Sequence, residues 1–528
     1  MASTTTPPGD LPTIAFTGGR ILTMDAARPS AEVVVTAGDR IVAVGERALL
    51  DAYPGARRVA LDGRVLVPGF IDAHNHLSIA ALHPLWADLS AVRDQDGLRA
   101  ALAGQAAREP GAAWIRGCNW NEASGLTVDR ADLDALGFDR PVLVAHYTLH
   151  QAAVSSAGLD ALGIGRDTPD PPGGHVVRAP DGTPTGILVE RAWSDAQARS
   201  MMAYHDPERW EGLFRARALA LTRDGITCVH DAACSPTAEG VYRRLRAAGR
   251  LPISVLMMPH GEALLSRLDP KRLDGAPTGD GDEWLRVGAV KLFADGGAAP
   301  AIDVHLGGGR IELGIVMPGV DEDVRLLVER GFGVAVHAIG NVGLANAIAA
   351  FRTARALRGG ADLRLRVEHA MLASPAQMAD LRALDLVGVV QPGFVDHVGS
   401  AVAGVEFDDA TWLPFGGLAR AGVRLAASSD DPCAFHEPLL TSSRGATRRC
   451  GSGAIVGPEH AIAYEEWLRA YTAGAAYAGG QEHERGRLVP GLRADLVILD
   501  GALDPEHPPT VGETWVAGER VYDAARDG

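Results

Sequence analysis

One stretch decides the fold: Val65-Leu66-Val67-Pro68-Gly69-Phe70-Ile71-Asp72-Ala73-His74-Asn75-His76. Its apolar residues predict a buried β-strand over 65–73, and side chains two positions apart in a strand point the same way. His74 and His76 therefore leave the strand end together. Neutral imidazole is the commonest metal ligand in proteins, so the pair predicts half of a metal site. The alternative is a pair of structural histidines without a metal, and the rest of the chain decides between the two.

Length and composition describe a soluble globular protein with a large core. The chain has 528 residues, of which 47% are hydrophobic, and a formal net charge of −16. This charge argues against a nucleic-acid partner, which would favour a basic surface. No apolar run approaches the ~20 residues that cross a bilayer, and the first residues lack the pattern of a signal peptide. We therefore expect a cytoplasmic protein with no membrane partner.

The two ends of the chain share one pattern, short apolar runs separated by turn signals. It covers residues 12–67 and returns over residues 486–528. Alternating runs and turns of this kind are typical of antiparallel strands. We expect the two ends to pair and form one small β-sandwich domain.

The region between them, residues 68–485, predicts an α/β fold, a (β/α)₈ TIM barrel. Short apolar runs alternate there with helical patterns, as repeated βα units require. After the first strand, the expected strands are 226–230, 253–258, 287–293, 334–337, 363–369, 386–390 and 423–428. Helices are expected at 321–330 and at 374–384, where Ser374 and Pro375 take the N-cap and first helical positions.

The connection between the first two barrel strands is too long for one crossover helix, so residues of about 78–200 form an inserted subdomain. Loops at this face of a barrel cover the active site. Trp120 and His150 lie in this segment. They either contact the substrate or stabilise the insertion itself.

Ionisable residues recur at the ends of the expected strands, where the active sites of barrels lie. His337 ends the fifth strand, His369 the sixth and Asp430 the eighth. Because the carboxyl ends of barrel strands meet at one face, we expect these side chains to lie near His74 and His76.

Lys291 is unusual because it lies inside an apolar strand. Burying an ammonium group is costly unless it is paired or its pKa falls until it is neutral. A neutral lysine can add carbon dioxide and become a carbamate, an anionic ligand able to bridge two metals. The alternative is a buried ion pair between Lys291 and Asp295 or Asp231.

Six segments carry a pattern that extends over almost the whole chain. They are 68–76, Val290-Lys291-Leu292-Phe293-Ala294-Asp295-Gly296, Val336-His337-Ala338-Ile339-Gly340, Val367-Glu368-His369-Ala370, Ser429-Asp430-Asp431-Pro432, and 471–477 followed by 486–497. In this order they resemble the metal-dependent amidohydrolase superfamily. Within it they resemble amidohydrolase family 3, the YtcJ-like branch that includes N-substituted formamide deformylase.

The resemblance implies a divalent metal centre, most simply zinc, with one or two ions per chain. The implied metal ligands are His74, His76, Lys291, His337, His369 and Asp430. The first two histidines would bind the more buried ion, a carboxylated Lys291 would bridge, and His337 and His369 would bind the second ion. The implied catalytic residues are Asp430 and His337, with Asp430 as general acid and base. Asp431 is the competing carboxylate.

The implied reaction is hydrolysis of a non-peptide C–N bond in a small amide through a metal-activated hydroxide. A divalent ion lowers the pKa of bound water towards ~7 and polarises a carbonyl. A carboxylate beside that water can take its proton and return it to the departing nitrogen. A non-hydrolytic lyase, such as a decarboxylase, and a catalytically silent barrel are the alternatives.

Further residues are expected around the substrate. His150 matches a histidine of the family pattern in the insertion, Gln391 follows the seventh strand, and Asn341 stands where the family usually has aspartate. With Trp120, these are the candidate substrate-binding residues. The roles of Glu190, His230 and Asp231 stay open between structure and catalysis. Exposed sandwich edges and the habit of the family lead us to expect a homodimer.

Overall fold

Strands from both ends of the chain share one sheet in the computed structural model, which describes residues 11–358 and 363–527. The sheet has the order β27-β26-β25-β5-β1-β2-β3, with β4 paired to β1. The strands are β1 (Thr13–Leu22), β2 (Ser30–Ala37), β3 (Arg40–Gly45), β4 (Arg57–Ala60), β5 (Val65–Pro68), β25 (Leu496–Asp500), β26 (Thr510–Val516) and β27 (Glu519–Asp523). The chain ends meet where β25 pairs antiparallel with β5. Hydrogen bonds join all these strands into one sheet, and the expected β-sandwich stays a prediction.

The stretch 65–73 is two strands rather than the one expected. β5 ends at Pro68 and lies in the sheet of the chain ends, whereas β6 (Phe70–Asn75) lies in a parallel sheet. Gly69 separates them, and its N–H donates to the carbonyl oxygen of Asp495 at 2.8 Å. A β-carbon at Gly69 would overlap the side chain of Thr227, so the chain passes between the sheets at a residue without one.

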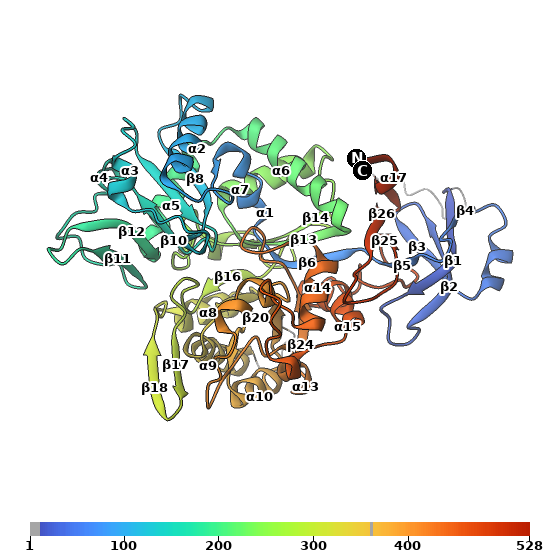
Figure 1. Cartoon of the computed structure of the whole chain (residues 1–528). Helices are drawn as coiled ribbons and strands as arrows, with labels where there is room; N and C mark the ends of the chain where they lie inside the picture. Colours follow the sequence, from blue (N-terminus) through green and yellow to red (C-terminus); the bar gives the residue numbers. More distant parts are fainter. Residues whose placement is uncertain (1–10, 359–362, 528) are drawn as a thin grey trace.

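Two parallel sheets lie at the centre of the molecule, with the orders β15-β14-β13-β6 and β16-β19-β20-β22-β24 (Figure 1). Their further strands are β13 (Ile226–Cys234), β14 (Ser254–Pro259), β15 (Leu285–Val287), β16 (Val290–Phe293), β19 (Val334–Ala338), β20 (Leu365–His369), β22 (Val387–Val390) and β24 (Arg424–Ala427). The expected strand 287–293 is divided between β15 and β16, which belong to different sheets. The edges of the sheets lie together, since β24 contacts β6 and β16 contacts β14.

Helices follow most of these strands. They include α1 (Leu77–Ala80), α6 (Pro207–Leu221), α7 (Pro236–Ala247), α8 (Val320–Glu329), α9 (Asn341–Arg358), α10 (Pro375–Ala383), α13 (Phe415–Arg420), α14 (Pro438–Thr447), α15 (Tyr464–Arg469) and α16 (Ala475–Ala478). Helix α10 begins as expected, because the Ser374 hydroxyl accepts from the Gln377 N–H while the Gln377 side chain accepts from the Ser374 N–H. A hairpin of β17 (Ile302–Leu306) and β18 (Gly309–Leu313) projects beside α9 (Figure 1).

The long connection after β6 forms a mixed sheet of its own, with the order β11-β12-β10-β9-β8-β7 (Figure 1). Its strands are β7 (Ala87–Asp88), β8 (Ile115–Trp120), β9 (Val142–His146), β10 (Gln151–Val154), β11 (Gly174–Arg178) and β12 (Pro184–Glu190). Helices α2 (Gln95–Arg108), α3 (Arg130–Asp134), α4 (Ser156–Leu162) and α5 (Ser194–Met202) accompany it. A separate apolar cluster that includes Leu98, Leu102 and Ile115 fills one side of this sheet.

Within the part of the chain that the structure describes, no helix has the length and apolar character needed to cross a membrane.

Candidate metal centre and catalytic pocket

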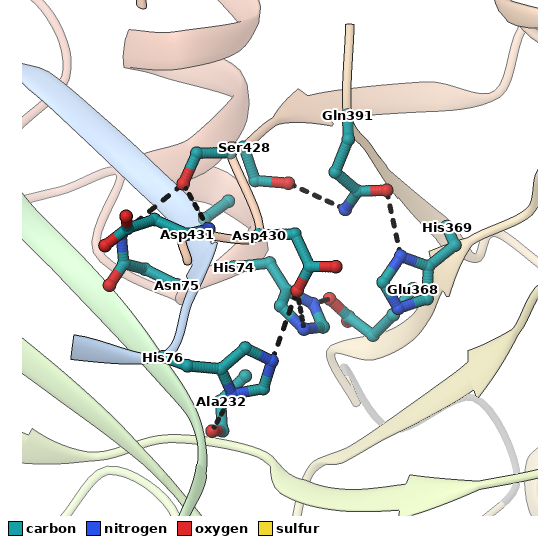
Figure 2. Close-up of polar contacts among 12 residues, drawn as sticks. His74, Asn75, His76, Ala232, Glu368, His369, Gln391, Ser428, Asp430 and Asp431 are labelled. Atoms are coloured by element: carbon teal, nitrogen blue, oxygen red, sulfur yellow. Dashed lines mark hydrogen bonds and ion pairs between the residues drawn. The ribbon is translucent and has the colours of Figure 1, made fainter. Parts of the chain in front are cut away.

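His74, His76 and Asp430 come together where β6 and β24 end (Figure 2). Oδ1 of Asp430 lies 3.4 Å from Nε2 of His74 and 3.2 Å from Nε2 of His76. All three side chains are buried, and one ligand atom from each lies within 4.8 Å of the others. Two imidazoles and one carboxylate at this spacing are a donor set that suits a divalent metal ion.

Each of three histidines is held through Nδ1, which leaves Nε2 for the centre (Figure 2). Nδ1 of His74 lies 2.5 Å from Oε2 of Glu368, and Nδ1 of His76 lies 2.9 Å from the carbonyl oxygen of Ala232. Nδ1 of His369 lies 2.9 Å from Oε1 of Gln391. Metal-binding histidines are oriented by contacts of this kind.

Three buried atoms around this centre lack a hydrogen-bond partner among the described residues: His74 Nε2, His337 Nε2 and Asp430 Oδ1. The ring of His337 lies 4.5 Å from that of His369, which lies 4.9 Å from that of His74. Buried polar atoms are normally paired, and a bound ion is one of the explanations for a cluster that is not. The residues present therefore fit a metal centre.

Burial keeps these histidines neutral, the form that binds metal. Burial, with the nearby Lys291, holds the pKa of His74 well below its ordinary value. Burial also lowers the pKa of His337 far below 6.5 and that of His369 to about 4. Burial opposes ionisation of Asp430, but the contact with His76 and the surrounding imidazoles outweigh it and hold its pKa below the usual value.

Beside the metal centre lies a cavity of about 150 Å³ with mostly apolar walls. Its lining includes Tyr147, Ile339, Met371, Phe394, Val398 and Trp412 together with His150, His337, His369 and Asp430. We call it the inner cavity. A larger cavity of about 960 Å³ shares Tyr147, His397 and Cys433 with it, so the two lie next to each other. No lysine or arginine lines the inner cavity among the described residues.

Comparisons with known proteins show the family of this chain. A model described as the amidohydrolase family matches residues 57–522. This chain belongs to the amidohydrolase family. It is 32% identical over 501 residues to N-substituted formamide deformylase of Arthrobacter pascens, covering 91% of this chain and 92% of that protein. It is 29% identical over 549 residues to the putative amidohydrolase YtcJ of Bacillus subtilis, covering 96% and 98%.

Solved structures show the same fold. A crystal structure of an uncharacterized metal-dependent hydrolase from Pyrococcus horikoshii superposes with a TM-score of 0.72 at 23% identity, covering 93% of this chain and 98% of that one. A second, from Pyrococcus furiosus, gives 0.69 at 23% identity over 94% and 100%. The expected membership of the amidohydrolase group is confirmed.

Lys291 of this amidohydrolase is buried in β16, 1% exposed, with Nζ 4.5 Å from the centre of the Phe293 ring. Burial lowers its pKa from 10.5 to about 8. Over residues 11–358 and 363–527, no ion pair joins Lys291 to Asp295 or Asp231. Asp295 instead accepts from backbone N–H groups, including that of Gly340 at 2.7 Å, and Asp231 accepts from the N–H of Ser78 at 3.1 Å. The alternative of a buried ion pair is therefore not what the structure contains.

Of the four residues expected at the substrate, the structure brings His150 to the inner cavity. Trp120 lies in the core of the insertion, where its Nε1 donates to the carbonyl oxygen of Leu126 at 2.9 Å. Asn341 pairs its amide with the backbone of Asp303 in β17, at 3.0 and 2.7 Å.

Gln391 lies behind His369 and not against the cavity. Its Oε1 faces His369, and its Nε2 donates to the Ser428 hydroxyl at 2.9 Å (Figure 2). Both ends of the amide are thus used within the protein. Gln391 is placed to orient His369 rather than to meet a substrate.

His230 and Asp231, whose roles the sequence left open, lie in β13 and make contacts within the protein. His230 is fully buried, with Nδ1 3.0 Å from Nη1 of Arg366, and burial lowers its pKa to about 3.

The Arg366–Glu368 pair was not predicted from the sequence. In it, Nε of Arg366 donates to Oε1 of Glu368 at 2.8 Å. Two charged residues at alternate positions of an apolar strand were the available signal.

Proposed function

We propose that this chain is a metal-dependent hydrolase that cleaves the C–N bond of a small amide. The observation that carries the proposal is the convergence, beside a cavity, of three buried atoms that form no hydrogen bond among the described residues: His74 Nε2, His337 Nε2 and Asp430 Oδ1. The similarity to N-substituted formamide deformylase supports an amide substrate, since that relative is named for hydrolysis of a C–N bond.

One divalent ion, which we expect to be zinc, would be held by His74, His76 and Asp430. A second would be held by His337 and His369, with a carboxylated Lys291 as the bridge. The lowered pKa of Lys291 supports this, because only a neutral amine adds carbon dioxide. When bound, a divalent cation supplies a Lewis acid for the carbonyl and lowers the pKa of water towards ~7.

Asp430 is the residue placed to move protons. Its Oδ1 lies at the metal centre, and its side chain also lines the inner cavity. Its lowered pKa keeps it ionised at neutral pH, so that it can accept a proton from the attacking water. Returning that proton to the amide nitrogen makes the nitrogen a better leaving group.

The inner cavity supports an uncharged substrate with a small apolar substituent. Its walls include Met371, Phe394 and Trp412 and carry no lysine or arginine among the described residues. An anionic group buried there would find no cationic side chain among the described residues, and Asp430, the carboxylate in this wall, is already assigned to the metal. We therefore propose a neutral amide, bound with its apolar part against these side chains.

We also propose that the two parallel sheets are halves of one (β/α)₈ barrel. The contacts of β24 with β6 and of β16 with β14 support closure. The ligands lie at strand ends or shortly after them, and active sites lie at this face in such barrels.

The masses of substrate and products test the proposal. We expect a panel of small N-alkylformamides and acetamides to give acid and amine, with the gain of one water. Loss of carbon dioxide from a carboxylated substrate would point to the alternative, a lyase that uses the same site. Absence of any turnover in protein that contains its metal would favour a silent barrel.

A further inference from the structure

The inserted sheet brings His150 to the wall of the inner cavity, with Glu190 bonded to it from behind. His150 immediately precedes β10, and Glu190 ends β12. The backbone N–H of Glu190 donates to the carbonyl oxygen of His150 at 2.7 Å. Between the side chains, Oε2 of Glu190 lies 2.6 Å from Nδ1 of His150. Neither residue has a role in the hydrolysis proposed above.

The Glu190 carboxylate is fully buried and fixed on its other side. Its Oε1 accepts from the backbone N–H groups of Ala298 at 2.8 Å and Ala299 at 2.9 Å, in the loop that follows β16. Glu190 itself has φ +53°, a backbone conformation that non-glycine residues adopt only where their surroundings hold them. The insertion is thereby bonded to the loop that follows β16, the strand that carries Lys291.

The loop leaves no room for the pair to move away. A β-carbon on Gly296 would overlap the Glu190 carboxylate, and one on Gly297 would overlap the ring of His150. The two glycines therefore permit a close approach of backbone to side chains that any other residue would block.

The pair determines which nitrogen of His150 carries the proton. An imidazole and a carboxylate 2.6 Å apart share a charge-assisted hydrogen bond, in which the ring nitrogen donates. The Gly297 N–H is also directed at Nδ1, at 2.9 Å, a hydrogen bond that Nδ1 accepts only when it carries no proton. The contact with the carboxylate is shorter and involves a charge, so we assign the ring proton to Nδ1. With the proton on Nδ1, a neutral ring presents Nε2 as an acceptor.

Nε2 is the nitrogen available to a bound molecule. The ring lines the inner cavity and lies 5.1 Å, centre to centre, from that of His337. No hydrogen bond to Nε2 occurs within the described residues. A polar acceptor is thus directed into a cavity whose walls are otherwise mostly apolar.

We propose that Glu190 positions His150 so that Nε2 accepts a hydrogen bond from the N–H of the substrate amide. This inference rests on the proposed amide hydrolysis and narrows it, because it selects primary and secondary amides over tertiary ones. His150 is then a catalytic residue that orients the scissile bond, and Glu190 is a positioning residue.

The test compares a secondary N-alkylformamide with its N-methyl tertiary analogue in the holoenzyme. The wild type should prefer the secondary amide by roughly 10- to 100-fold in kcat/KM, the range expected when a buried polar group loses its hydrogen-bond partner. Glu190→Gln should remove most of this preference, because the Gln amide can donate to Nδ1 and so place the ring proton on Nε2. Metal content should not change.

Glu122→Gln is the matched control. Glu122 forms the other close Glu–His pair of the insertion, 2.7 Å from Nε2 of His146, and neither residue lines the inner cavity. It should retain the wild-type preference. If Glu190→Gln slows both amides equally or releases metal, Glu190 has a structural role only and the inference is overturned.

A spectrum of the ¹⁵N-histidine-labelled holoenzyme tests the pair without a substrate. Among the signals of Nδ1-protonated rings, one set should belong to His150. This set should vanish in His150→Ala and move to the Nε2-protonated form in Glu190→Gln. A His150 ring already protonated on Nε2 in the wild type would overturn the inference. If the wild type hydrolyses neither amide, the proposed function itself fails, and the spectrum alone decides the positioning.

Discussion

Oε2 of Glu368 lies 2.5 Å from Nδ1 of His74, and both side chains are fully buried. Arg366 fixes the Glu368 carboxylate, because it donates to it from Nε at 2.8 Å. Because Nδ1 of His74 is occupied, its Nε2 faces Asp430. Glu368 and Arg366 thus fix the orientation of His74, a proposed metal ligand.

Glu368→Gln should weaken metal binding by about 10- to 100-fold, the usual effect of losing a carboxylate behind a histidine ligand. Competition with a chelator measures the affinity. Glu239→Gln is the control, since Glu239 is also buried and pairs with an arginine, Arg272, at 3.2 Å. Equal affinities in the two variants would show that Glu368 does not support the metal.

Asp430→Asn should lower kcat by about 10²- to 10⁴-fold, because the amide cannot accept a proton from water. The neighbouring Asp431→Asn should have a much smaller effect, since Oδ2 of Asp431 is bonded to Arg217 at 2.6 Å. Single-turnover rates at saturating substrate compare the two. The reverse order of effects would make Asp431 the general base.

Lys291 should take up carbon dioxide as the pH rises through about 8. Its pKa is lowered to about 8, and an amine is neutral above its pKa, so about half is reactive at that pH. Metal-free protein equilibrated with bicarbonate should gain the mass of one carbon dioxide, increasingly from pH 7 to 9. Lys291→Gln should gain none, and an unmodified wild type at every pH would exclude the bridge.

Metal should be retained well below the pH at which ordinary histidines protonate. A ring is charged below its pKa, and burial lowers that of His369 to about 4, so this ligand stays neutral down to about pH 4. Metal content after dialysis should therefore fall as the pH drops through about 4. Half-loss near pH 6.5, in protein still folded by circular dichroism, would contradict this.

The convergence of the candidate ligand histidines could be predicted because each lies at the end of an apolar strand, and strand ends converge whatever the loops do. His74, His337 and His369 illustrate this, as does Asp430 after β24. The divided strands could not be predicted, because a glycine such as Gly69 interrupts an apolar run without a change in hydrophobicity. Only the packing against Thr227 shows why the chain turns there.

The surroundings of the ligands depend on contacts between distant segments. Glu190 reaches His150 through the pairing of β10 with β12, and Gln391 reaches His369 across neighbouring strands. Trp120 shows the converse, since a large aromatic residue in a covering segment suggested a substrate contact but fills the core of the insertion. Which face of an inserted sheet meets the active site is not encoded in local patterns.

Titration of zinc into metal-free protein, with amide hydrolysis followed at each step, shows whether the hydrolysis depends on bound metal. Activity should rise with the metal bound, reach a plateau at one or two ions per chain, and be absent in His76→Ala although that variant is folded. Hydrolysis that is equally fast without metal, or unchanged in His76→Ala, would contradict this dependence.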